Sequence, residues 1–202
     1  MKHVAFSTSV QQVQSERGSR VAYAKVEARG ALETEVTDDL REFLAGIDTA
    51  YLATASADGQ PYIQHRGGPK GFIRALDDHT LAFVDLTGNR QYISTGNLRE
   101  NPRVCLFLMD YAHRQRVKVW GTAKVVPVTP ELVAQLAVPE RARPEQVMLV
   151  TVTQWDANCS QHIPVKLGAA DVTAAIERLQ ARIAELEAEN ARLRSATGLD
   201  AM

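Results

Sequence analysis

The sequence predicts a mainly β protein of the α+β class, in which a small barrel with short helices is followed by one long helix. Between Tyr51 and Thr153, short stretches with strand patterning alternate with turn residues such as Asp58-Gly59. The C-terminal part instead carries apolar residues at spacings of three and four, as one side of a helix does. The length of 202 residues suits one compact domain with appendages.

Local patterns place the elements in order. Residues 1–36 are expected to form an irregular or partly helical arm, and Thr37 can cap a short helix with Leu40 and Leu44 on its apolar face. Two further helices are predicted at 88–101 and 130–136. Strands are predicted at 51–56, 62–66, 72–76, 80–85, 104–109, 116–126 and 147–153. The run at 104–109 is apolar throughout, which predicts a fully buried strand with Cys105 in the core.

The C-terminal helix is predicted to pair with another copy of the chain as a coiled coil. The alternating a and d positions of its heptads hold Ile176, Leu179, Ile183, Leu186, Asn190 and Leu193. Asn190 at an a position favours a parallel pair of helices, and charges at e and g agree with it. An antiparallel pair would also match Arg182 with Glu189, so charge alone does not decide. A helix packed on its own barrel is the alternative.

Composition excludes several classes of function. The net charge is −1 and no run of Lys or Arg forms a basic patch, so no nucleic-acid partner is expected. No apolar run is long enough to cross a bilayer, and no secretory signal is recognised, so a cytoplasmic protein without a membrane partner is expected. The two cysteines do not make a disulfide scaffold.

Three segments bring together polar groups that suit an anion. Gln64 to Lys70 ends a strand with two glycines and two cations, where backbone N–H groups can approach a ligand. The segment from Gly88 is expected to begin a helix, with Ser94 one turn on, and a helix N-terminus attracts anions. Arg116 and Lys118 share one face of a strand. A phosphate-bearing ligand would satisfy all three segments; a polar rim without a ligand is the alternative.

Several motifs resemble the pyridoxamine 5′-phosphate oxidase-like family of FMN-binding split barrels. They are the stretch from Tyr51 to Pro61, the Gly88-Asn89-Arg90 turn, Glu100-Asn101-Pro102 and the stretch from Arg116 to Gly121. Two further motifs resemble those of the branch of predicted flavin-nucleotide-binding proteins. They are Gln-His-Arg-Gly-Gly-Pro at 64–69 and Asn-Cys-Ser-Gln-His-Ile at 158–163. The resemblance covers roughly residues 40–165.

The resemblance implies a split β-barrel homodimer with FMN at the subunit interface. It therefore implies an FMN-dependent oxidoreductase acting on an unknown small molecule, with 1–36 as an arm, 37–167 as the FMN-binding domain and 168–202 as the coiled-coil helix. A non-catalytic flavin-binding or flavin-sensing module, and relatives that use haem or a deazaflavin, are the alternatives. The residues expected to bind FMN are Gln64, His65, Arg66, Gly67, Lys70, Val84, Asn89, Arg90, Gln91, Ser94, Arg116 and Lys118.

No catalytic residue is assigned, but Cys159 and His162 are candidates. They lie beyond the last predicted strand, in a segment that is either a lid over the flavin or a tight turn. A Cys and a His alone do not make a metal site, so no metal is expected. The oxidases' C-terminal substrate-binding pattern is absent, and one cation of their phosphate-binding turn is lost at Gly88-Asn89-Arg90. The vitamer substrate of the oxidases is therefore not expected.

Overall fold

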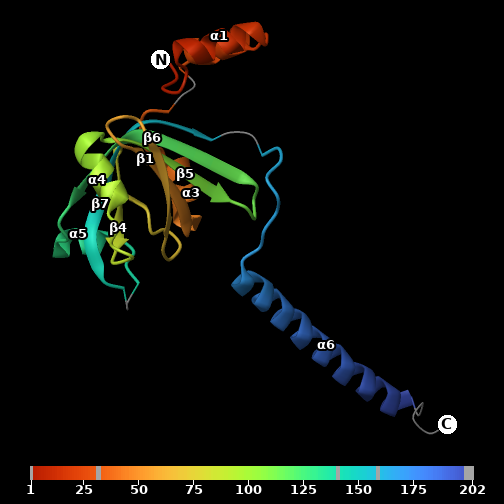
Figure 1. Ribbon diagram of the computed structural model, residues 1–202. Helices are drawn as coiled ribbons and strands as arrows, with labels where there is room; N and C mark the ends of the chain where they lie inside the picture. The colour runs from red at the N-terminus through yellow and green to blue at the C-terminus, as the bar shows by residue number, and fades with distance from the viewer. Residues whose placement is uncertain (1, 31–32, 140–141, 158–159, 198–202) are drawn as a thin grey trace. The chain divides into compact units, whose positions relative to one another are not determined.

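A computed structural model describes residues 2–30, 33–139, 142–157 and 160–197 of the protein (Figure 1). The chain divides into two compact units. One comprises Met1–Asp110 and Arg114–His162, and the other comprises Tyr111–His113 and Ile163–Met202. The first unit contains the sheet and the second contains the long C-terminal helix.

A seven-stranded antiparallel sheet forms the body of the first unit, as predicted for a small antiparallel barrel. The strand order is β2-β1-β5-β6-β7-β4-β3. The strands are β1 (Thr49–Ala55), β2 (Pro61–Gly67), β3 (Arg74–Ala75), β4 (Thr80–Leu86), β5 (Arg103–Asp110), β6 (Gln115–Val126) and β7 (Pro144–Ala157). The turn at Asp58-Gly59 joins β1 to β2, as its sequence indicates, and Gly59 takes a positive φ of 91° there. The strand predicted at 72–76 shrinks to the two residues of β3, because Phe72 and Ile73 are buried in the core outside the ladder.

A large hydrophobic cluster fills the space enclosed by the sheet, and a smaller one contains Ala82, Leu136 and Val147. Alternate residues of β1, β5 and β6 point inward, so Leu52, Leu106 and Val119 are fully buried. The prediction of a fully buried β5 was wrong, because only alternate residues of β5 are buried. Cys105 is half-buried on the outward face and not in the core, and burial raises the pKa of its thiol.

The helices of this unit are short. They are α1 (Thr8–Glu16), α2 (Arg20–Ala28), α3 (Asp38–Gly46), α4 (Ile93–Glu100) and α5 (Pro130–Gln135). Thr37 caps α3 as predicted, since its Oγ1 accepts a hydrogen bond from the Leu40 N–H at 3.4 Å. Leu40 and Leu44 face the core and are buried.

Helix α4 begins five residues later than the sequence predicted. Arg90 and Tyr92 have φ values of 61° and 53°, in the left-handed region that a right-handed helix cannot include. Residues 87–92 are therefore an irregular loop, and the helix starts at Ile93. The anion-binding turn expected at Gly88 is thus a loop that leads into the helix.

The N-terminal arm packs on the outward side of β6 and β7. Gln154 of β7 is buried, and its side-chain amide accepts from the Val4 N–H at 2.7 Å and donates to the Lys2 carbonyl at 3.2 Å. The His3 ring packs edge-on against Trp120 of β6, with ring centroids 5.1 Å apart. Residues 2–4 are therefore held on the sheet by two hydrogen bonds between their backbone and the Gln154 side chain and by a ring contact.

The second unit is dominated by α6 (Ala169–Thr197), which confirms a long C-terminal helix. Lys166 holds its ammonium 4.3 Å from the Tyr111 ring centroid, within this unit. Gly198, expected to end the helix, lies outside the described residues. No helix in the described part of the chain is long and apolar enough to span a membrane.

We predict that Gly121→Ala strongly destabilises the fold. A Cβ at this position would lie 2.0 Å from the Thr151 carbonyl oxygen, at the register shift between β6 and β7. The backbone must move, so we expect a loss of about 3 kcal/mol or more in the free energy of unfolding, measured by chemical denaturation. Gly96→Ala in α4 is the control, because a Cβ there meets nothing within 4 Å. Equal stability of the two variants would contradict the packing at Gly121.

We also predict that acidification releases the N-terminal arm. Burial lowers the pKa of His3, which outweighs the opposite influence of Asp156. The unfolded arm has the higher pKa, about 6.5, so its docking is fully stabilised above that pH and weakens as the pH falls below it. Hydrogen exchange of the Val4 and Ala5 amides, corrected for intrinsic rates, should rise from pH 7.5 to 5.5. In His3→Gln this additional rise should disappear; its persistence would assign the effect to another group.

Candidate functional site

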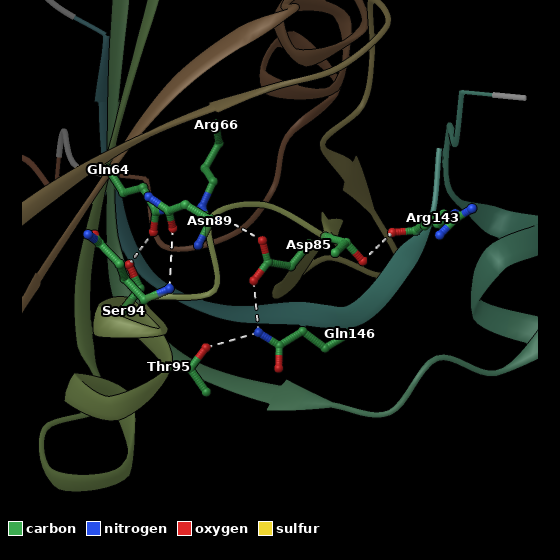
Figure 2. A network of polar contacts seen from close by, with 10 residues as sticks. Gln64, Arg66, Asp85, Asn89, Ser94, Thr95, Arg143 and Gln146 are labelled. Carbon is green, nitrogen blue, oxygen red and sulfur yellow. Dashed lines mark hydrogen bonds and ion pairs between the residues drawn. The ribbon is translucent and has the colours of Figure 1, made fainter. Parts of the chain in front are cut away.

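The two ends of the sheet meet at one polar cluster. Strand β2 lies at one edge of the sheet, and β4 lies next to the other edge. Arg66 of β2 nevertheless forms an ion pair with Asp85 of β4, and both side chains are nearly nine-tenths buried (Figure 2). This contact requires the sheet to curl until its ends approach each other, and it places the polar cluster at the seam of the barrel.

The ion pair belongs to a larger hydrogen-bonded network. The Gln146 side chain on β7 donates to the Asp85 carboxylate at 2.8 Å and to the Thr95 hydroxyl at 2.9 Å (Figure 2). Within the described chain, Nε of Arg66 is buried without a hydrogen-bond partner. Because a buried N–H of a guanidinium is costly to leave unsatisfied, this atom marks a place where a ligand acceptor would be favourable.

Gln64 joins β2 to the beginning of α4. Its side-chain oxygen accepts a hydrogen bond of 2.8 Å from the hydroxyl of Ser94, which is 2 % exposed (Figure 2). Tyr92, the residue before α4, makes no side-chain capping bond to the helix. Ser94 lies in the first turn of α4, so its bond to Gln64 holds β2 near the helix N-terminus, where the helix dipole favours a negative charge.

The loop that precedes α4 presents exposed polar groups. Asn89 accepts a hydrogen bond of 3.3 Å from the Gln91 N–H. Arg90 Nε donates to the Tyr92 hydroxyl at 3.3 Å, and this bond raises the pKa of Arg90. The Tyr92 hydroxyl in turn donates to Glu145. Asn89, Arg90 and Gln91 are all exposed, so they are accessible to an anion from solution.

A narrow recess lies next to this cluster. It is lined by glycine, proline and apolar side chains, which include Gly67, Gly68, Val84 and Leu86. A Cβ at Gly68 would lie 2.6 Å from Cβ of Phe72, so the absence of a side chain there permits the close packing of this turn. Lys70 comes directly after the lining residues 67–69 in the sequence, and its side chain is exposed.

Three of the predicted residues lie on the other face of the sheet. Side chains alternate along β2, so His65 points away from Gln64 and Arg66 and packs edge-on against Tyr51 at 5.9 Å. Strand register then links Tyr51 to Phe107 and Phe107 to Lys118, on the same outward face. Arg116 shares this face of β6. One copy of the chain therefore does not bring His65, Arg116 and Lys118 to the seam.

The candidate catalytic residues are only partly described. Cys159 and Asn158 lie outside the described residues. His162 is exposed and has a φ of 63°, and the nearby Ser160 carbonyl accepts a hydrogen bond of 3.1 Å from Arg114. In the described ranges, no group of three or more His, Cys, Asp or Glu side chains is arranged to hold a metal ion.

Sequence reasoning missed Asp85, Thr95 and Gln146. Asp85 lies in the predicted strand 80–85, where an acidic residue near a strand end is usually solvated. Gln146 precedes the last predicted strand by one residue. Neither has a sequence signal of its own, because their roles depend on the sheet curling until β2 meets β4.

Comparison with known proteins identifies the family. The profile of the pyridoxamine 5′-phosphate oxidase family matches residues 36–159. The chain belongs to the pyridoxamine 5′-phosphate oxidase-like family. This confirms the resemblance drawn from the sequence motifs and the assignment of a split-barrel fold. A search of curated proteins found no significant match.

Solved structures similar to this chain share a low sequence identity with it. HupZ from Group A Streptococcus is 19 % identical, with a TM-score of 0.46 over 65 % of this chain and 98 % of its own. General Stress Protein 26 from Bacillus anthracis is 14 % identical, with a TM-score of 0.41 over 57 % and 88 %. HutZ, the heme storage protein from Vibrio cholerae, is 14 % identical, with a TM-score of 0.41 over 61 % and 93 %.

We predict that Asp85→Asn destabilises the barrel far more than a similar change at an exposed ion pair. The substitution removes the charge that compensates the buried Arg66, so the free energy of unfolding should fall by about 3 kcal/mol. Asp78→Asn is the matched control, since Asp78 is 73 % exposed in its pair with Arg41 and should cost under about 1 kcal/mol. Similar losses in both variants would show that the seam pair does not hold the barrel together.

Proposed function

We propose that this protein binds FMN and acts as an FMN-dependent oxidoreductase on an unidentified small molecule. The observation that carries the proposal is the convergence of Gln64, Arg66 and Ser94 at the barrel seam, in a chain that belongs to this family. FMN combines a polar ring edge with a phosphate, so it needs neutral and charged donors in one place. The seam contains an amide, a guanidinium and a helix N-terminus.

The donors at the seam fit the two ends of FMN. Arg66 Nε and the Gln64 side chain would hold the polar edge of the ring, because the Arg66 donor is buried and Gln64 beside it is half-buried. Ser94, the first N–H groups of α4 and the exposed Arg90 would hold the phosphate. Asp85 would repel a phosphate placed against it, so the phosphate should lie toward the α4 side of the cluster.

Bound FMN would supply the electron transfer, while the protein binds and orients it and controls access to it. The Arg66–Asp85 pair would fix the position of the guanidinium and limit its freedom before the ligand arrives. Asn89 and Gln91 can add donors at the exposed side, and Gly67 and Val84 contribute the adjoining recess. Cys159 and His162 remain candidates for contact with substrate.

A homodimer would complete the site. His65, Arg116 and Lys118 lie on the outward face, so they could serve a flavin only at the seam of a second copy. That face is partly apolar: Tyr51 and Phe107 are half-buried and Ile63 is 66 % exposed, while His3 of the N-terminal arm packs on Trp120. We propose that residues 37–167 form this dimeric FMN-binding domain in the cytoplasm, and that 1–36 and 168–202 are appendages. The C-terminal helix would add a second contact between copies.

The visible spectrum of the purified protein, with the mass of any released cofactor, tests the proposal. A flavin spectrum and release of FMN are expected. Reduction of that flavin by NADH, NADPH or a reduced deazaflavin would support an oxidoreductase, while a flavin inert to all three would favour a binding or sensing module. A haem absorbance band, or a protein that remains colourless after addition of FMN, would overturn the cofactor assignment.

We predict that Arg90→Gln and Ser94→Ala each weaken FMN binding by about tenfold or more. Arg90→Gln removes a charged donor from the proposed phosphate site, and Ser94→Ala removes a hydroxyl that would turn from Gln64 to the phosphate; a hydrogen bond to a charged group contributes about 1.5–3 kcal/mol. Binding is measured by quenching of FMN fluorescence. Arg99→Gln is the control, because Arg99 lies in the last turn of the same helix and is exposed there. Unchanged affinity in both site variants would place the phosphate elsewhere.

A further inference from the structure

The long helix α6 carries an exposed apolar seam. The exposed fractions of its side chains are 49 % at Ile176, 65 % at Leu179, 53 % at Ile183, 46 % at Leu186 and 59 % at Leu193. These side chains form one stripe along the helix, in which Asn190 is the polar position between Leu186 and Leu193. Such a stripe marks an interaction surface, because exposed apolar area of this kind is unfavourable in water.

We propose that this seam binds the same seam of a second copy as a two-stranded, parallel, in-register coiled coil. Isoleucine occupies the a positions 176 and 183, and leucine occupies the d positions 179, 186 and 193. This distribution favours a coiled coil of two parallel helices, because β-branched residues pack well at a and leucine packs well at d of a parallel dimer.

Asn190 decides the orientation. In a parallel, in-register pair, the two copies of Asn190 face each other, and their amides can exchange a hydrogen bond. An antiparallel pair that matches Ile176 with Leu193 and Ile183 with Leu186 places Asn190 opposite Leu179. The amide would then be buried against an aliphatic side chain without a partner, which is unfavourable.

The flanking charges favour the same orientation. Across a parallel pair, Arg182 at g faces Glu187 at e of the other copy, and Glu189 at g faces Arg194 at e. By symmetry each attraction occurs twice. The antiparallel pair offers only the attraction between Arg182 and Glu189 among these charges. Within one helix, Arg182 pairs with Glu185 at 2.9 Å, but both side chains are more than 60 % exposed, so this contact is readily exchanged.

The seam is short, and the coil therefore depends on a second contact between copies. Residues 176–193 make fewer than three heptads, so the apolar area that each helix can bury against its partner is small. Two chains already joined elsewhere would hold their α6 helices at a high effective concentration. This step rests on the proposed barrel dimer, whereas the orientation follows from the helix sequence alone.

Cysteine cross-linking of the full chain tests the orientation. Under mild oxidation, Leu193→Cys should form a bridge between the two copies of residue 193 much faster than Arg178→Cys, whose c position lies outside the seam. Ile176→Cys and Leu193→Cys chains are then co-expressed. A parallel pair keeps residues 176 and 193 about 25 Å apart, so no mixed bridge forms. Peptide mapping that finds mainly 176–193 bridges, or a Leu193→Cys rate no faster than that of Arg178→Cys, would overturn the proposal.

A charge exchange provides a second, independent test. In the Leu193→Cys chain, Glu187→Arg should slow cross-linking by about fivefold, and Arg182→Glu added to it should restore the rate. Glu177→Arg, at a b position, should leave the rate unchanged. Failure of the double variant to recover would contradict the parallel charge pairing. FMN content is measured in the same samples. Absence of FMN would contradict the proposed cofactor, whereas the cross-linking rates test the coiled coil separately.

Discussion

The ion pair between Arg66 and Asp85 joins strands from opposite ends of one sheet, and the site depends on it. It connects β2, at one edge of the sheet, to β4, next to the other edge, beside the contact between Gln64 and Ser94. The same pair accounts for the polar network to Gln146 and Thr95. A buried ion pair contributes less to stability than to geometry, because desolvation offsets much of its attraction. Its main effect here is to fix a guanidinium at the barrel seam, with one N–H unsatisfied.

Much of the fold was predictable because strand and turn signals are local. The Asp58-Gly59 turn, the Thr37 cap and the alternation along β6 all follow from a few neighbouring residues. The start of α4 was not predictable, because the left-handed backbone at Arg90 and Tyr92 occurs at residues other than glycine and therefore has no sequence signal. The alternating burial along β5 was also not predictable, because a run of apolar residues does not show which face of the strand meets the core.

The residues predicted to bind FMN lie on two different faces of the sheet, which a comparison of sequence motifs does not reveal. Neighbouring residues of a strand point to opposite faces, so Gln64 and His65 cannot serve one ligand within one chain. Both residues nevertheless belong to the same family motif in the sequence. In the proposed homodimer, a second copy would resolve this conflict by bringing its outward face to the seam of its partner. The exposed heptad seam of α6 supports association of copies by an independent route.

The most direct test of this account is the NMR signal of the Arg66 Nε–H group during titration with FMN. This N–H is buried and lacks an acceptor within the described chain, so a ligand at the seam should supply one. The account predicts a saturable shift of this resonance, with little change at Arg99 on the far end of α4. Binding of FMN without a change at Arg66, or no binding at all, would contradict the assignment of the barrel seam as the cofactor site.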